Sequence, residues 1–193
     1  MYNDRFKDPK EQRARIDLLN AWIEKMRAFP KPVIASVEGA AAGAGFALAL
    51  ACDLVVSARD ARWLMAYVKI GANPDGGGSL FLCRGIPHQL AAELMLEGGL
   101  ITADRLHGLG IVNRISEPGA ALETAIAWAT RLADGPTAAM GRIKDLIERA
   151  YGVPVQPHLT VDANYMNQSL YHPEGQEGVT AFMEKRKPNF PHE

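Results

Sequence analysis

Two loops of small residues carry the groups in this chain that are best suited to chemistry. The first runs from Gly39 to Gly45 and lies between an apolar segment and the apolar run from Phe46 to Cys52. A strand that leads through such a loop into a helix directs unpaired backbone N–H groups and the positive end of the helix dipole at one point. The loop therefore predicts a site for developing negative charge. A tight turn packed on a neighbouring strand fits the same pattern.

The second loop holds the best-placed carboxylate of the chain. Asp75 lies between Pro74 and three glycines, so the backbone before it is rigid and the backbone after it carries no side chains. This setting suits a general acid or base. Pro-Asp-Gly is also a common turn, and Asp75 has the type of side chain that caps a following helix.

Apolar spacing predicts the elements that must position these loops. An amphipathic helix is expected from Glu11 to Phe29. Buried strands are expected at residues 33–37, 54–57 and 111–115. Helices are expected at residues 46–52, at 88–97, from the N-cap Thr102 to Gly108, and three or four times after Gly119. We therefore expect an α/β core over residues 1–118 and a helical part over residues 119–193.

Composition narrows the classes of protein. A chain of 193 residues with 48% hydrophobic residues is long enough for one domain with a substantial core. The net charge of −1, with both signs interspersed, predicts neither a nucleic-acid nor a membrane partner. The histidines lack metal-ligand spacing, so no metal is expected, and Cys52 and Cys83 in apolar runs are expected to be core thiols. With no signal peptide or membrane-length apolar run in view, we expect a cytoplasmic protein.

Six collinear blocks of the sequence resemble the crotonase superfamily of enoyl-CoA hydratases and isomerases. The blocks are Lys31–Gly39, Gly43–Gly45, Leu48–Asp53, Pro74–Ser79, Ile101–Asn113 and Ala181–Phe190. The resemblance implies a crotonase-like ββα spiral core with a helical C-terminal trimerisation part, assembled as a homotrimer or a hexamer. It also implies an acyl-CoA thioester as substrate and no cofactor beyond the coenzyme A that the substrate carries.

The resemblance also assigns roles to residues of the two loops. Ala44 would supply one of two backbone amides that stabilise the enolate oxyanion of the thioester. Asp75 falls where several isomerases of the superfamily place an acid, and one carboxylate suffices to move a proton between two carbons. The two glutamates of family hydratases fall at Ala47 and Tyr67, so hydration by two acids is disfavoured. Substrate contacts are expected at Gly43, Gly45, Phe46, Ala47, Tyr67, Pro74 and Gly76, and coenzyme A contacts at Phe182 and Lys185.

The stretch Met65-Ala-Tyr-Val-Lys69, followed by Pro74–Ser79, further resembles a branch of the superfamily from aerobic phenylacetate breakdown, whose members are labelled oxepin-CoA hydrolase. An aromatic pocket for a ring or a conjugated acyl group would be formed by Phe46, Trp63, Tyr67 and Phe81. Aromatic residues of this kind are also ordinary core residues.

One departure from the superfamily concerns the segment before residue 11. Members of the superfamily place strand pairs and an Ala-Gly-Ala-Asp type of loop, the source of the first oxyanion donor, ahead of a helix like that of residues 11–29, and we expect this chain to lack them. Three functions stay open. The chain is an enoyl-CoA isomerase that uses Asp75 and the Ala44 amide, an enoyl-CoA hydratase or ring-opening hydrolase of aromatic-acid catabolism, or a non-catalytic crotonase-fold subunit that binds coenzyme A.

Overall fold

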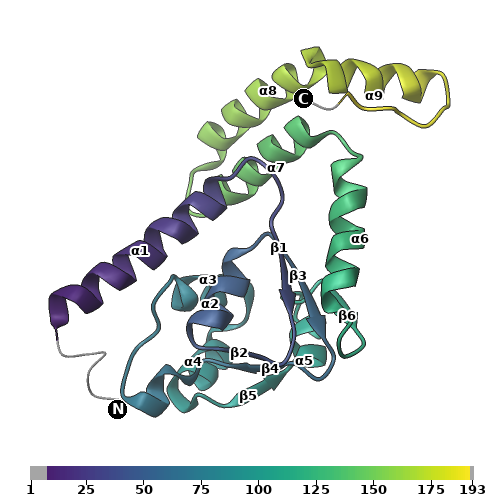
Figure 1. The fold of residues 1–193 in the computed structure, drawn as a ribbon. Coiled ribbons are helices and arrows are strands. Elements are labelled where there is room, and N and C mark those ends of the chain that lie inside the picture. The colour runs from purple at the N-terminus through teal and green to yellow at the C-terminus, as the bar shows by residue number, and fades with distance from the viewer. Residues whose placement is uncertain (1–7, 192–193) are drawn as a thin grey trace. The chain divides into compact units, whose positions relative to one another are not determined.

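The computed structural model describes residues 8–191 (Figure 1), and their contacts divide them into two compact units. One unit takes the described residues up to Arg27 together with Val33–Ala125, and the other takes Ala28–Pro32 together with the described residues from Ile126 onward. Residues 1–7 and 192–193, which the predicted division into 1–118 and 119–193 includes, lie outside the described residues.

In the described residues, the first unit is built on two three-stranded sheets. The first sheet has the order β1-β3-β6 and is parallel throughout, with β1 at Ile34–Val37, β3 at Leu54–Ala58 and β6 at Arg114–Ser116. The second sheet has the order β2-β4-β5, in which β2 (Ala40–Ala42) runs parallel to β4 (Arg62–Leu64) and β4 antiparallel to β5 (Leu100–Thr102). The chain thus contributes a strand to each sheet in turn, first β1 and β2 and then β3 and β4.

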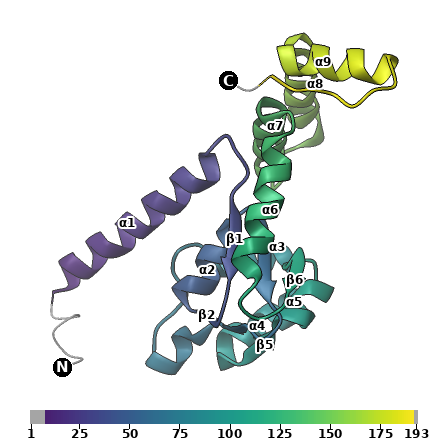
Figure 2. The same cartoon turned by 45° about the vertical axis from the view of Figure 1, so that its right-hand side comes forward.

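Helices connect and cover these strands. They are α1 (Pro9–Ala28), α2 (Ala44–Ala51), the 3-10 helix η1 (Ala66–Ile70), α3 (Gly78–Gly85), α4 (His88–Glu97) and α5 (Ala103–Gly108). Figure 2 shows α2 beside β1, and α2 also packs against α3. Helix α2 is apolar on all sides because it lies in the middle of this unit, where Phe46, Ala47 and Ala49 are buried.

Phe46 and Trp63 form the centre of the core of the first unit. Both side chains are fully buried, and their ring centroids lie 4.9 Å apart in an edge-to-face arrangement. The indole N–H of Trp63 donates a hydrogen bond of 3.1 Å to the Ser57 hydroxyl, so the buried polar atom of the ring has a partner. Because Trp63 lies on β4 and Ser57 on β3, this bond ties the two sheets together.

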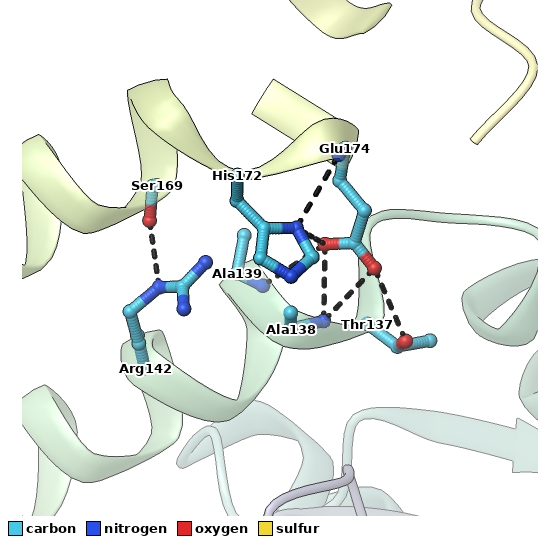
Figure 3. A network of polar contacts seen from close by, with 7 residues as sticks. All are labelled: Thr137, Ala138, Ala139, Arg142, Ser169, His172 and Glu174. Atoms are coloured by element: carbon cyan, nitrogen blue, oxygen red, sulfur yellow. Dashed lines mark hydrogen bonds and ion pairs between the residues drawn. The ribbon is translucent and has the colours of Figure 1, made fainter. Parts of the chain in front are cut away.

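The second unit contains helices α7 (Thr137–Arg149), α8 (Val155–Tyr171) and α9 (Pro173–Met183), and α6 (Ala121–Ala133) runs into it from the first unit. A buried carboxylate holds its helices together (Figure 3). Glu174 on α9 accepts hydrogen bonds from the backbone N–H groups of Ala138 and Ala139 and from the Thr137 hydroxyl, at the start of α7. The N-terminus of α7 therefore compensates the burial of this charge.

Most of the predicted helices are confirmed. Helix α4 has the predicted bounds and ends at Gly98 in the left-handed conformation, and the Thr102 hydroxyl accepts the Arg105 N–H as the N-cap of α5. Four helices follow Gly119 in the described part of the chain. The strand predicted at 111–115 is wrong at its start, because the N–H groups of Ile111 and Val112 turn back to the Leu106 carbonyl.

Two further observations qualify the sequence-based view. Cys52 is half-buried but Cys83 is exposed on α3, so the prediction of a core thiol is wrong for Cys83. Every helix within residues 8–191 is too short or too polar to bridge a lipid bilayer.

Candidate active site

Strands β2 and β4 bring the two predicted loops together. Ala42 and Leu64 are partners at the carboxyl ends of these two parallel strands, and the Gly43 N–H extends the pairing with a hydrogen bond of 2.9 Å to the Leu64 carbonyl. The chain continues from Ala42 into α2 and from Leu64 into η1. The residues that follow the two strands, Gly43 and Tyr67 among them, are therefore neighbours, which is the usual place for ligands in parallel sheets.

The Ala44 amide occupies the first position of α2. Its N–H therefore has no acceptor within the helix. Gly43 precedes it with a φ of 53° and no side-chain cap, and both Ala44 and Gly45 are exposed. A Cβ added at Gly43 would lie 3.6 Å from the Tyr67 ring. Glycine thus satisfies the positive φ, and the exposed helix N-terminus beside Tyr67 suits an oxyanion.

The Asp75 carboxylate lies against Tyr67. The Tyr67 hydroxyl donates a hydrogen bond of 2.7 Å to Oδ1 of Asp75. The turn interpretation of the Asp75 loop is confirmed for the backbone, because the Gly78 N–H donates to the Asp75 carbonyl at 3.0 Å. The capping interpretation is wrong, because α3 begins after Gly77 without a side-chain cap.

The surroundings of Tyr67 keep its phenol protonated. Burial is the main cause that raises the pKa of the Tyr67 phenol well above the ordinary value of 10.0. The hydrogen bond to Asp75 and the negative charge of Asp75 raise it further. The phenol therefore stays protonated and serves as a donor. No cation among the described residues forms an ion pair with Asp75, which leaves its carboxylate without a neutralising partner.

Ala47 does not face the site. Its side chain is fully buried, and a Cβ added at Gly78 would lie 3.0 Å from the Ala47 Cβ. At Gly76, where φ is 57°, an added Cβ would lie 3.1 Å from Cδ1 of Ile23. The glycines of the Asp75 loop thus let that loop lie directly on Ala47 and α1. The Asp75 loop covers the Ala47 side chain, and its contact with substrate stays a prediction.

Of the two interpretations of the aromatic residues, the core interpretation is confirmed for Phe46 and Trp63, which are both fully buried. Phe81 is half-buried, and the Arg27 guanidinium lies over its ring at 4.6 Å from the centroid. Of the four aromatic residues, Tyr67 lies between the two loops.

The other predicted site residues take different positions. Pro74 is half-buried in the Asp75 loop. Gly45 lines an apolar cavity of about 320 Å³ that is bounded by α1, β1 and α2. Phe182 is 81% exposed at the end of α9, and Lys185 follows in the left-handed conformation with a φ of 54°. These two residues belong to the second compact unit, and their contacts with coenzyme A stay a prediction.

The other ionisable groups among the described residues do not form a second centre. Glu174 is the buried acid of the second unit, but its carboxylate oxygens accept hydrogen bonds from the start of α7 and serve packing (Figure 3). Within residues 8–191, no group of His, Cys, Asp and Glu residues is arranged to hold a metal ion.

The Tyr67–Asp75 hydrogen bond is the part of the site that the sequence did not reveal. The sequence predicts Tyr67 as a substrate contact and Asp75 as a catalytic acid, but it does not predict a contact between them. The two residues both follow β4, and the short helix η1, which carries Tyr67 and is closed by the Ala72 N–H on the Tyr67 carbonyl, has no periodic pattern that would predict their contact.

A family model and individual relatives point to the same protein family. The family model described as enoyl-CoA hydratase/isomerase matches residues 2–193. The chain is 36% identical over 171 residues to a 1,2-epoxyphenylacetyl-CoA isomerase of Escherichia coli K12, covering 89% of this chain and 65% of the relative. It is 32% identical over 166 residues to a 2,3-dehydroadipyl-CoA hydratase of the same organism, covering 86% of this chain and 65% of the relative.

Solved structures agree with the sequence matches. An enoyl-CoA hydratase from Polaromonas sp. JS666 aligns with a TM-score of 0.94 and 44% identity, over 97% of this chain and 73% of that chain. An enoyl-CoA hydratase from Bacillus anthracis aligns with a TM-score of 0.91 and 26% identity, over 100% of this chain and 75% of that chain. The predicted crotonase-like α/β fold is thereby confirmed. The chain spans 65% of the length of both Escherichia coli relatives.

Proposed function

Because the chain belongs to the enoyl-CoA hydratase/isomerase family, we propose that it is an enoyl-CoA isomerase, which moves a double bond along the acyl chain of a coenzyme A thioester. The observation that carries this proposal is the position of Asp75. It is a carboxylate without a cation, next to Tyr67 and close to the exposed N-terminus of α2.

The proposed reaction begins with the thioester carbonyl at the Ala44 N–H. Asp75 removes a proton from the carbon next to the double bond, so that a C–H bond breaks and an O–H bond forms on the carboxylate. The released electron pair moves into a dienolate, whose negative oxygen the Ala44 amide and the α2 dipole stabilise. Asp75 then returns the proton two carbons away, and the double bond has shifted without any oxidant, reductant or water.

Hydration is the less favoured alternative for this site. A hydratase of the two-acid kind would need carboxylates at Ala47 and Tyr67 to hold and activate water. Ala47 lies beneath the Asp75 loop, and the Tyr67 phenol is a protonated donor. The relative named 1,2-epoxyphenylacetyl-CoA isomerase supports isomerisation, whereas the relative named 2,3-dehydroadipyl-CoA hydratase is the reason to test hydration as well.

We also propose that the chain needs no cofactor beyond substrate-borne coenzyme A and that it forms a homotrimer or a hexamer. Apolar side chains on the helical part support the assembly. Those exposed on α6 to α9 include Leu122, Ile126, Ile143, Ile147, Leu159, Met166 and Phe182. Exposed apolar area of this extent is typical of a surface that another subunit covers. Sedimentation of the purified protein tests the assembly, and a stable monomer would contradict it.

The experiment that tests the proposed activity uses trans-3-hexenoyl-CoA and crotonyl-CoA. We expect the protein to convert the first into its conjugated isomer, followed by the ultraviolet absorbance of the conjugated thioester, and to hydrate the second far more slowly. Faster hydration than isomerisation would contradict the proposal. Binding of the thioester without either reaction, measured by calorimetry, would instead favour a non-catalytic subunit.

A further inference from the structure

We infer that Tyr67 is the positioning residue for Asp75. It holds one carboxylate oxygen, so that the other oxygen moves the substrate proton and returns this proton before the proton exchanges with water. The inference rests on the proposed isomerase function and adds to it a residue that touches both halves of the site. Its basis is the hydrogen bond from the Tyr67 hydroxyl to Asp75 and the place of the Tyr67 ring beside Gly43, where an added Cβ would lie 3.6 Å from it.

The hydrogen bond makes the two oxygens of Asp75 unequal. Oδ1 accepts the Tyr67 hydroxyl at 2.7 Å, and within residues 8–191 no further partner of the carboxylate is found. A carboxylate that is held through one oxygen cannot rotate freely about its last side-chain bond. Oδ2 is therefore the oxygen left for proton transfer, in a fixed direction.

Tyr67 itself is held on two sides. Its ring lies against Gly43, at the residue before the Ala44 amide. Its carbonyl accepts the Ala72 N–H at 3.1 Å, which closes η1 just before Asp75. Because the hydrogen bond holds the backbone and Gly43 lies beside the ring, the phenol oxygen has little freedom to leave Asp75. Tyr67 thus fixes the distance between the amide that stabilises the enolate and the acid that moves the proton.

The protonation state of Tyr67 fits this role. Burial and the nearby charge of Asp75 raise the pKa of the phenol, so it donates and does not accept a proton from substrate. A glutamate at this position would accept a proton and hold water. A phenol that donates to Asp75 is not a base that could activate water at this position. The proton on Oδ2 therefore stays available for return to the dienolate.

The test compares Tyr67→Phe with Tyr165→Phe. Both changes remove a phenol that donates to an aspartate at 2.7 Å, but Tyr165 pairs with Asp145 in the second compact unit. Isomerisation of trans-3-hexenoyl-CoA is run in D2O, and both the rate and the deuterium content of the product are measured. We expect Tyr67→Phe to lower kcat about ten- to hundredfold, with KM within about twofold, and to raise the deuterium incorporated per turnover. Tyr165→Phe should change none of these.

A second measurement tests the Tyr67–Asp75 hydrogen bond independently of catalysis. A low-field phenol proton resonance is expected in the unmodified protein, and it should disappear in both Tyr67→Phe and Asp75→Asn. Its absence from the unmodified protein would overturn the inference. An active protein whose Tyr67→Phe variant keeps the same kcat and deuterium content would overturn the inference alone. A protein that binds the thioester but does not isomerise it would overturn the proposed function and this inference together.

Discussion

Within residues 8–191, two tyrosine–aspartate hydrogen bonds of 2.7 Å have the same donor and acceptor but different surroundings. Tyr67 lies on η1 and Asp75 on the loop that follows it, both in the first compact unit. Tyr165 on α8 pairs with Asp145 on α7 in the second unit, where Arg149 lies one helical turn after Asp145 and forms an ion pair with it.

The difference lies in what neutralises each carboxylate. Removal from water raises the pKa of Asp145, but hydrogen bonds from Arg149 and Tyr165 outweigh this effect and lower the pKa below its ordinary value of 3.8. Asp145 is thus held as a carboxylate by a cation and joins two helices. Asp75 has the same phenol but no cation among the described residues, and it stands beside an exposed helix N-terminus. The surroundings, and not the pair itself, favour chemistry at one aspartate and structure at the other.

Replacing each aspartate by asparagine gives the largest contrast. Asp75→Asn should lower the isomerisation rate by at least about a hundredfold, because the amide keeps the size of the side chain but cannot act as a base. Thioester binding, measured by calorimetry, should stay within a few-fold. Asp145→Asn, the matched control, should leave turnover unchanged. An Asp75→Asn variant that keeps most of the rate would refute the assignment of Asp75.

A new carboxylate beneath the Asp75 loop tests whether a family hydratase position is open. Ala47→Glu should destabilise the fold by about 3 to 5 kcal/mol, since the charge would be buried under Gly76 and Gly78 without a partner. Urea unfolding measures the loss, and Ala47→Ser serves as a smaller polar control. A stable Ala47→Glu variant that hydrates crotonyl-CoA would show that the loop opens and that hydration is within reach.

Crowding the amide tests the other half of the site. Ala44 is exposed, so Ala44→Val should change the midpoint of thermal unfolding little. The β-branched side chain should lower turnover by about tenfold or more, because the thioester oxygen must come within about 3 Å of the N–H. Ala42→Val, at a neighbouring exposed alanine on β2, is the control. Equal losses of stability and rate in Ala44→Val would favour a purely structural turn.

The smallest effect is expected at the structural pair. Because the pKa of Asp145 is lowered in the folded state, its contribution to stability is complete above the ordinary value of 3.8 and is lost as the pH falls through the folded-state value. Tyr165→Phe should move that loss to higher pH and cost less than about 1 kcal/mol, since the pair is partly exposed to solvent. Carboxyl titration by NMR measures the shift. An Asp145 that titrates at or above 3.8 would contradict the comparison.

The sequence predicted the long elements of the fold well and the contacts of the site poorly. Helix α4 and the capped helix α5 carry their own start and stop signals, and their bounds are those expected. Strands β2 and β4 have three residues each, which is too few for a periodic pattern, so the approach of Tyr67 to Gly43 was not predicted. Phe46 illustrates a second limit, because its burial depends on packing against Trp63, which residue type alone does not reveal.

The parallel pairing of Ala42 with Leu64 gives the site two separable halves. In the proposed mechanism, residues 43–51 activate the thioester, whereas residues 65–77 carry the groups that move a proton. Each segment leaves its own strand end and returns to a helix of the same core, α2 or α3, which pack together. Substitutions within the second segment can therefore redirect the reaction while the first keeps its hold on the carbonyl. Under the proposed function, such a division allows the segment that moves the proton to change while the segment that binds the thioester carbonyl stays the same.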